Sequence, residues 1–163
     1  MRTYKIKDIS EKIFSGGTPS TKVISYWNGY HPWLSSGETQ NEYIYSTLKT
    51  ISVSGIKNSS TKMAKHDSVI IASAGQGKTR GQVSYLKIDS YINQSIIAIQ
   101  SDLHFVLPKY LFYNLKNRYN EIRLFSDSTS TRGSITTKMV GELSIDLPNL
   151  EHQQHIVDIL RII

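Results

Sequence analysis

Residues 72–81, Ala-Ser-Ala-Gly-Gln-Gly-Lys-Thr-Arg-Gly, formally match a nucleotide-binding phosphate loop: an alanine, four further residues, then glycine, lysine and threonine. Such a loop holds phosphate with its backbone N–H groups and with the dipole of the helix that follows it. Here Gly81 falls where the first helical turn would begin, and the apolar residues of 82–88 favour a strand. No later apolar strand ends in an aspartate placed to hold magnesium. The match therefore predicts no nucleotide hydrolase.

The same residues predict a β-hairpin with a basic, glycine-rich tip. The glycines would let the backbone approach DNA closely, while Lys78 and Arg80 would meet phosphate or guanine. A solvated tip that binds nothing is the plain alternative. A nucleotide hydrolase using Lys78 and Thr79 is a rival of another class, and ATP binding that is lost in Lys78→Ala would support it.

The composition is that of one globular domain, because 163 residues with 39% hydrophobic and 20% charged content can bury one core. Without cysteine the chain forms no disulfide or thiolate metal site, so a cytoplasmic setting is expected. The N-terminal residues lead into no long apolar segment, and we expect neither a signal peptide nor a membrane span. A formal net charge of +6 favours a polyanionic partner, although a well-solvated basic surface also fits.

The first half of the chain reads as a short helix, a loop and several strands. The spacing of apolar residues over 6–14 predicts the helix, and the glycines at 16 and 17 end it. Residues 17–36 form an aromatic loop, and 51–53 a short strand. Three further strands are predicted over 68–73, 82–88 and 92–99. The fold class is therefore α+β, with a twisted mixed β-sheet and flanking helices.

The second half is expected to be mainly helical. A helix begins at Pro108 and runs to about residue 125, with Leu111, Leu115, Tyr119 and Ile122 as its buried stripe. A polar loop over 126–134 follows, then a short helix capped by Thr136 or Thr137 and a strand over 144–147. Asn149 caps a last helix that runs to the end of the sequence. The apolar side of this helix carries Leu150, Ile156, Ile159, Leu160 and Ile163. Such a side at a terminus indicates either truncation or a partner helix from another chain that covers it.

Four stretches, taken in order, carry a family resemblance. They are SGGTPSTKVISYWNGYHPWLSSGE, TISVSGIKNSS, HDSVIIASAGQGKTRGQVSY with INQSIIAIQ, and STSTRGSITTKMVGELSIDLPNLEHQQHIVDIL. Together they resemble a target recognition domain of the DNA specificity subunit of type I restriction-modification systems. No single motif is specific, but their order and spacing are, and the resemblance covers essentially the whole chain.

The resemblance implies a recognition domain over residues 1–148 and the start of a dimerisation or spacer helix over 149–163. Two departures stand out: the closing Glu-Gln pair appears as Glu151-His152-Gln153, and the long helix that it opens is cut off at Ile163. A full specificity subunit has two recognition domains, so this chain would be a half subunit, an isolated domain or a shortened product. In the family such helices carry much of the docking to the methyltransferase, and this sequence contains only the start of one.

The implied function is non-catalytic recognition of one half of a split double-stranded DNA target. A partner methyltransferase subunit would methylate adenine with S-adenosylmethionine, a nuclease subunit would join, and this chain would need no cofactor or metal. The alternatives are a recognition domain of a fused restriction-methylation enzyme and a protein-interaction module without DNA specificity. His152 and His155 lie three residues apart on the last helix, but no third metal ligand is evident.

The residues expected to contact DNA lie at the tips of the two polar loops. Arg80 and Arg132 would pair with guanine edges, and the lysines with phosphate. Trp27, Pro32 and Trp33 belong to shared motifs, so we interpret them as core, and Asn93 and Gln94 as bracing of the sheet. The DNA-binding candidates are Ser73, Gln76, Lys78, Thr79 and Arg80 in the hairpin, Ser130, Thr131, Arg132, Ser134 and Lys138 in and after the second loop, and, more weakly, Lys57 and Lys62.

Overall fold

The computed structural model describes residues 1–75, 77–129 and 133–163 and contains three sheets. The largest has five strands in the order β2-β10-β7-β8-β4. Its pairs are antiparallel except for β8 and β4, which run parallel, so the predicted mixed sheet is confirmed. The strands are β2 (Ser10–Ser15), β10 (Ile96–Ser101), β7 (Val69–Ala72), β8 (Val83–Leu86) and β4 (Tyr43–Ile44).

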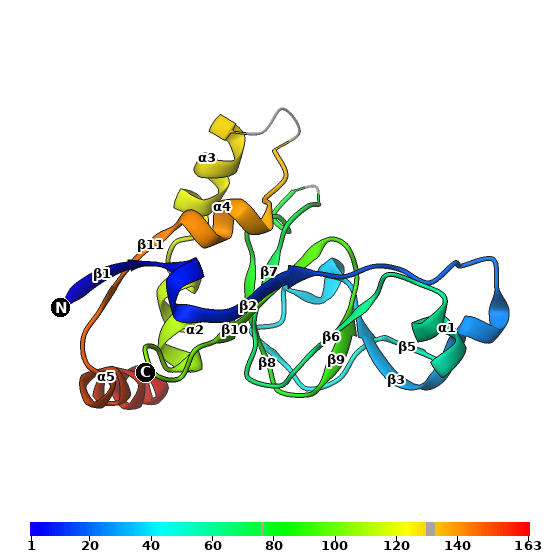
Figure 1. The fold of residues 1–163 in the computed structure, drawn as a ribbon, viewed down its shortest axis with the longest axis horizontal. Helices are drawn as coiled ribbons and strands as arrows, with labels where there is room; N and C mark the ends of the chain where they lie inside the picture. Colours follow the sequence, from blue (N-terminus) through cyan, green and yellow to red (C-terminus); the bar gives the residue numbers. More distant parts are fainter. Residues whose placement is uncertain (76, 130–132) are drawn as a thin grey trace.

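A second sheet of four strands, in the order β5-β3-β9-β6, extends from the first toward one end of the molecule (Figure 1). It pairs β3 antiparallel with β5 and parallel with β9. Its strands are β5 (Lys49–Ile51), β3 (Trp27–Leu34), β9 (Ser90–Ile92) and β6 (Lys62–Ala64), and the short helices η2 (Ile24–Tyr26), η3 (Ser36–Glu38) and α1 (Val53–Lys57) lie in the connections.

The remaining helices gather at the other end of the molecule, around a two-stranded sheet (Figure 1). Helices α3 and α4 lie above the large sheet in this view, whereas α2 lies against it and α5 runs below. The elements are β1 (Arg2–Lys5) paired with β11 (Ser144–Leu147), η1 (Ile6–Ile9), α2 (Pro108–Lys116), α3 (Tyr119–Thr129), α4 (Thr137–Glu142) and α5 (Leu150–Ile162).

The central strands β10, β7 and β8 of the large sheet are buried on both faces, which explains their nearly continuous apolar sequences. All four residues of β7 and of β8 are buried. Successive side chains of β7 point to opposite faces: Ile71 contributes to the cluster that includes Phe112 of α2, and Ile70 to the cluster shared with Leu34 of the second sheet. The sheet is therefore the rigid base from which the loops project.

The prediction of a helix over 6–14 is wrong. Only residues 6–9 are helical, as a 3₁₀ turn, and the chain then continues as strand β2. Ile13 packs against one hydrophobic cluster and Phe14 against the other. Ile13 and Phe14 therefore point to opposite faces of a strand, and their spacing from Ile6 and Ile9 only resembles that of a helix.

The glycines at 16 and 17 do not end a helix; they let the chain pass close to β9. The N–H groups of Gly16 and Gly17 donate to the carbonyls of Asn93 and Ile92, at 3.2 and 3.1 Å. A Cβ atom on Gly16 would lie 2.0 Å from the Ile92 carbonyl oxygen, so a larger residue cannot occupy this position without moving the backbone.

Four other expected boundaries also differ. The aromatic loop predicted over 17–36 contains strand β3, and the strand predicted over 51–53 ends at Ile51, where Ser52 caps helix α1. The single helix expected from Pro108 breaks after Lys116 into α2 and α3. Residues 126–129 of the expected polar loop belong to α3. In the predicted stripe Leu111, Leu115 and Ile122 are buried, whereas Tyr119 is half-buried.

The predictions for the end of the chain are largely confirmed. Thr136 caps α4, β11 spans the predicted strand, and the Asn149 side chain accepts a hydrogen bond from the His152 N–H at 2.8 Å. Helix α5 packs against the body through Val157 and Gln153, both buried. The Gln153 carboxamide accepts from Leu107 N–H at 2.9 Å and donates to two backbone carbonyls. The proposed division at residue 148 stays a prediction.

The residues of the shared motifs lie in or directly after strands β3 and β9 of the second sheet. Trp33 is buried, as expected of core, while Trp27 and Pro32 are half-buried. The two indoles meet edge to face with ring centroids 5.1 Å apart. The Asn93 side chain accepts a hydrogen bond from Ser95 N–H at 3.0 Å, and that of Gln94 accepts one from the Thr18 hydroxyl. The helices found in residues 1–75, 77–129 and 133–163 include no candidate for a membrane-spanning segment.

Candidate nucleic-acid interface

The predicted hairpin is present and is formed by β7 and β8. Its strands pair antiparallel from Val69 opposite Tyr85 to Ile71 opposite Val83, and two backbone hydrogen bonds between Ala72 and residues 81–82 close the base of the tip. Gly75, Gly77 and Gly81 have positive φ angles of 128°, 64° and 93°, which larger residues rarely adopt. The chain returns as a strand and not as a helix. The phosphate-loop interpretation therefore lacks the helix N-terminus that it needs.

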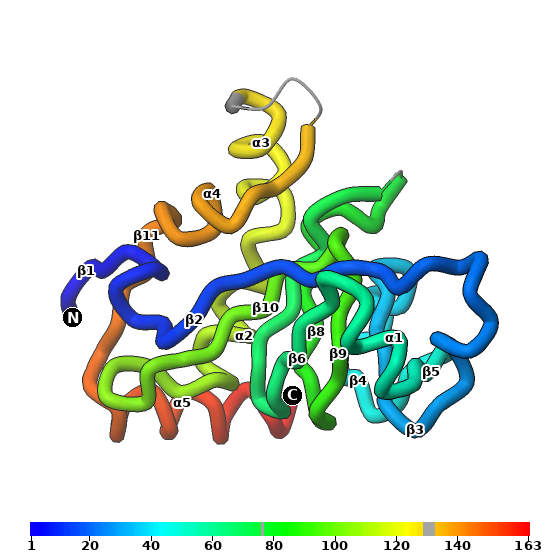
Figure 2. The backbone as a smooth tube through the Cα atoms, turned by 45° about the vertical axis from the view of Figure 1, so that its right-hand side comes forward, coloured from blue at the N-terminus to red at the C-terminus, as the bar shows by residue number. Residues whose placement is uncertain are grey.

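Helix α3 stands beside the tip, on the same side of the sheet (Figures 1 and 2). The Tyr119 hydroxyl donates to the Lys78 carbonyl at 2.7 Å, and the Arg123 guanidinium donates to the Arg80 carbonyl at 2.6 Å. The Arg123 guanidinium also lies 5.3 Å from the centroid of the Tyr119 ring, within cation–π range. These two side chains fix the backbone on the β8 side of the tip.

The side chain of Arg80, in turn, extends from the tip to α3. Its guanidinium forms an ion pair with Asp127 at 3.0 Å and donates to the Ser126 hydroxyl and to the Arg123 carbonyl. Only 13% of the Arg80 side chain is exposed. Arg80 was expected to read guanine, but in this arrangement its donors face α3.

We call this set of contacts between α3 and the hairpin tip the α3 brace. Its α3 side chains are Tyr119, Arg123, Ser126 and Asp127, and they contact Arg80 and the carbonyl of Lys78.

The second polar loop also returns to the hairpin. The Ile135 N–H donates to the Ser73 carbonyl at 2.8 Å, at the point where β7 ends. A Cβ atom on Gly133 would lie 3.6 Å from Cζ of Arg80, so the backbone of this loop runs close to the brace. Described residues of the hairpin tip and of the second polar loop, two segments that the sequence predicts separately as DNA contacts, thus lie next to each other.

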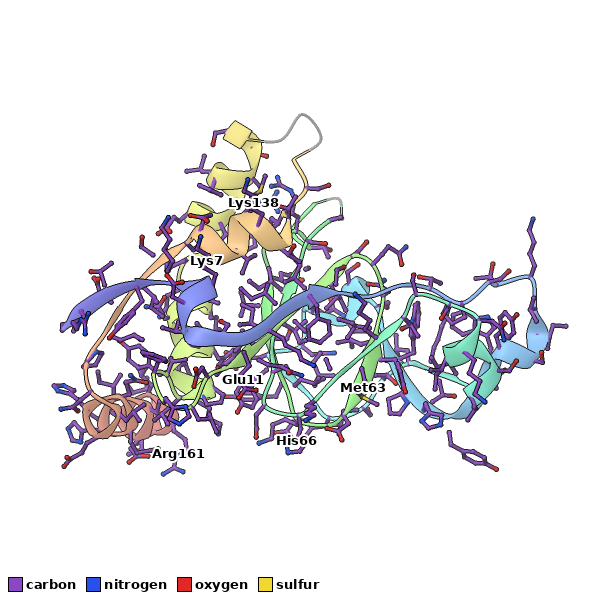
Figure 3. All side chains as sticks on the ribbon, viewed as in Figure 1. Lys7, Glu11, Met63, His66, Lys138 and Arg161 are labelled. Atoms are coloured by element: carbon purple, nitrogen blue, oxygen red, sulfur yellow. The ribbon has the colours of Figure 1, made fainter. Side chains whose placement is uncertain are left out.

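The individual candidates fall into three groups. Lys78 at the tip and Lys138 on α4 are exposed, and Lys138 lies on the side of the molecule from which α3 projects (Figure 3). Thr79 and Ser134 are half-buried, and Ser73 is buried with its backbone bonded on both sides. Four candidates, Gln76, Ser130, Thr131 and Arg132, lie outside the described residues.

Lys57 and Lys62 are exposed but belong to a different part of the molecule. Lys57 is the last residue of α1, which lies at the opposite end from α3 and α4, and Lys62 begins β6 in the second sheet (Figure 1). The structure does not bring these two lysines together with the hairpin tip.

Sequence reasoning missed the residues that fix the tip. Tyr119 was assigned to a buried stripe, and Arg123 and Asp127 were not singled out. The available signal was their spacing, because residues 119, 123 and 127 recur at intervals of four and so share one face of a helix directly before the polar loop.

A second ion-pair cluster fixes α4, which carries Lys138. Glu142 at its end accepts from the ammonium groups of Lys5 at 2.6 Å and Lys7 at 2.8 Å. These hydrogen bonds lower the pKa of the Glu142 carboxyl to about 2 and raise the pKa of Lys7. The described part of the chain contains no group of three or more acidic or histidine side chains that could hold a metal ion. His152 and His155 are exposed on α5.

Solved structures with the same fold come from type I restriction-modification systems. The HsdS subunit from Thermoanaerobacter tengcongensis matches with a TM-score of 0.75 at 19% identity, over 98% of this chain and 36% of that one. The S subunit from M. genitalium matches with a TM-score of 0.71 at 14% identity, over 99% of this chain and 38% of that one. The expected fold class is confirmed by this likeness.

Sequence comparison points to the same proteins. The specificity subunit of the type I restriction enzyme EcoR124I/EcoR124II of Escherichia coli is 30% identical over 152 residues, or 91% of this chain and 37% of that subunit. The MjaIX specificity subunit of Methanocaldococcus jannaschii is 28% identical over 166 residues, or 96% of this chain and 36% of its own length. This chain thus spans little more than a third of these relatives.

The profile of the type I restriction modification DNA specificity domain matches residues 1–163. Its match spans both polar loops and the helix that carries the brace. The chain therefore belongs to the type I restriction-modification DNA specificity domain family.

Proposed function

We propose that this chain is a target recognition domain that reads one half of a split double-stranded DNA site for an adenine methyltransferase of a type I restriction-modification complex. Membership of the specificity domain family supports this proposal. The observation that carries it is that one side of the sheet joins the hairpin tip to both neighbours of the second polar loop. The α3 brace fixes the tip to α3, which precedes that loop, and the Ile135 N–H, which follows it, donates to the Ser73 carbonyl.

The shape and chemistry of the hairpin fit this role. The major groove of B-DNA admits a two-stranded β-ribbon, and a glycine-rich tip keeps such a ribbon narrow. The exposed ammonium of Lys78 would contact phosphate and set the register, without carrying sequence information. Hydroxyl and amide groups of the two loops would supply the contacts to base edges.

In this proposal Arg80 acts as a positioning residue. Its guanidinium already has three partners on α3, so reading guanine would require it to leave them. Arg132 stays the candidate for a bidentate contact with guanine. Catalysis would belong to partner subunits, with methyltransferase and restriction subunits as the expected partners.

Selection from a randomised duplex pool at moderate salt, with and without the cognate methyltransferase subunit, tests the proposal. We expect a short enriched motif, at least in the presence of that subunit. Binding that depends on salt but enriches no motif under either condition would contradict the proposal, because phosphate contacts alone carry no sequence information.

We further propose that α5 contributes to a partner interface through its exposed apolar residues. Ile159 is 47% exposed and Ile163 is 94% exposed, whereas Ile156 and Leu160 are half-buried, so the first two are free for a partner helix. If the chain self-associates through α5, changing both Ile159 and Ile163 to Lys should lower the sedimenting mass toward that of a monomer. An unchanged mass would remove α5 from the self-association interface.

A further inference from the structure

A third polar segment borders the hairpin tip, and it contains none of the DNA-binding candidates found from the sequence. It is the turn between η3 and β4, residues 39–42. Gln40 of this turn lines an open hollow of about 400 Å³ together with Lys78 of the tip, Gln82 before β8 and Tyr119 of α3. The hollow thus joins this turn to the tip and to the α3 brace.

The backbone on both sides of Gln40 is held in place by β8 and the residue before it. The Ser84 hydroxyl lies within hydrogen-bonding distance of the carbonyls of Thr39 and Asn41, at 3.0 and 2.6 Å. The buried Thr39 hydroxyl is bonded to the Gln82 side chain at 3.0 Å. Residues 39 and 41 therefore cannot move without breaking contacts with the strand that carries the hairpin tip.

The start of the turn is fixed by a buried carboxylate. Glu38 is only 5% exposed, and its oxygens accept hydrogen bonds from Ser35 N–H at 2.9 Å and from Leu48 N–H at 2.8 Å. The Asn41 N–H donates to the Glu38 carbonyl at 3.1 Å. Several hydrogen bonds thus determine the course of a short surface turn.

Gln40 itself is exposed, and its carboxamide makes no hydrogen bond to any residue that the structure describes. A glutamine side chain can both donate to and accept from an adenine edge in the major groove, a pairing that a fixed backbone favours because less freedom is lost on binding. An unpaired amide on a rigid turn, next to an exposed lysine, has the properties of a base-reading group.

Resting on the proposed DNA recognition, we propose that Gln40 is a specificity-determining residue that reads adenine beside the bases contacted by the two polar loops. Lys78, which lines the same hollow, would hold the adjacent phosphate. In this proposal the hollow would receive an adenine edge in the major groove together with the neighbouring backbone phosphate.

Duplex selection with the full chain, together with the methyltransferase subunit if binding requires it, tests this assignment in Gln40→Ala and Gln40→Glu. Gln40→Ala should keep the enriched motif but lose preference for adenine at one position by about 5- to 150-fold, with affinity for unrelated DNA and the salt slope unchanged. Gln40→Glu should move that preference toward cytosine, because a carboxylate accepts from the cytosine amino group. Gln154→Ala, which removes an exposed amide on α5, is the matched control and should change nothing.

The outcomes separate this inference from the proposed function. If both Gln40 variants enrich the same motif as the unchanged chain, Gln40 does not read bases, although DNA recognition stands. If the Gln40 variants lose affinity equally for all DNA sequences, the assignment is also overturned, because such a loss indicates a phosphate contact. If the unchanged chain enriches no motif, the proposed function fails and this inference fails with it. Should Gln40→Ala not fold, Gln40→Glu, which preserves size, decides alone.

Discussion

The two ends of the β7–β8 hairpin are held in different ways. At the base every residue of both strands is buried, and the cores on the two faces of the sheet fix its position. At the tip, Lys78 is exposed, three glycines have positive φ, and the contacts come from side chains of α3. Burial of apolar surface therefore determines where the hairpin stands, whereas polar contacts determine the shape that it presents. Such a division would let the tip change its sequence without loss of the fold.

Phe112→Ala should have the largest effect, and it should act on the base. The Phe112 ring is fully buried and packs edge to face against Tyr85 of β8, with centroids 5.6 Å apart. Removing a buried phenyl ring should lower the free energy of unfolding by about 3–5 kcal/mol, measured by urea denaturation. Phe125→Ala, which truncates a partly exposed ring on α3, should cost much less. An equal loss in both variants would contradict the contrast between base and tip.

Arg80→Ala should have an intermediate effect on stability. It should alter the shape of the hairpin tip while the hairpin itself remains folded. Loss of the ion pair with Asp127 and of the bonds to α3 should cost about 1–2 kcal/mol of unfolding free energy, since Asp127 is half exposed. Preference should fall at several positions of the selected motif, because the whole tip loses its support. A loss confined to one position would show instead that Arg80 reads a base. Arg161→Ala on α5 is the matched control.

Glu142→Gln should weaken the attachment of α4 in a way that depends on pH. The carboxyl pKa is lowered from an ordinary value of 4.5 to about 2, so its ion pairs stabilise the fold above pH 4.5 and lose this effect as the pH falls toward 2. The melting temperature of the variant should therefore be lower at pH 7 and converge with that of the unchanged chain at pH 2. Glu151→Gln, which removes an exposed carboxylate on α5 outside this cluster, is the matched control. A constant difference across this range would exclude the ion pairs as its cause.

Lys78→Ala should have the smallest effect on the fold and a clear one on binding. We expect the free energy of unfolding to change by less than about 0.5 kcal/mol, because Lys78 is exposed. DNA affinity should fall equally for all sequences, and the slope of log K against log salt should flatten by about one unit. Lys57→Ala, at the far end of the molecule, should leave both quantities unchanged. An equal flattening with Lys57→Ala would extend the interface to α1.

The base of the β7–β8 hairpin and the cap of α5 were largely predictable from the sequence, because both depend on local patterns. Strands β7 and β8 and the cap at Asn149 rest on local patterns of apolar residues and on side chains that bond nearby backbone. The strand expected over 92–99 divides instead into the end of β9 at Ile92 and β10 from Ile96. The hairpin was predictable because glycines and β-favouring residues lie on either side of Lys78. In contrast, the helix expected over 6–14 proved to be mainly strand, because the apolar pattern does not show that both faces of the sheet are covered.

The fixed shape of the tip was not predictable from local patterns. Arg80 looks like a free loop cation in the sequence, and only the position of α3, some 40 residues later, shows what its guanidinium contacts. The turn at Gln40 was missed for the same reason, because its backbone is held by Ser84 of a strand that follows much later. Long-range polar contacts leave no periodic signal in a sequence.

In the proposed function the braced tip, and not Lys57 or Lys62, forms the DNA interface. Photo-crosslinking can locate this interface, with a photoreactive residue placed singly at position 78, 134 or 57 and a duplex that carries the selected motif. We predict efficient crosslinks to DNA from positions 78 and 134 and none above background from position 57. Crosslinks from position 57, with none from positions 78 and 134, would exclude the braced tip as the DNA interface and place that interface at the end of the molecule that carries α1.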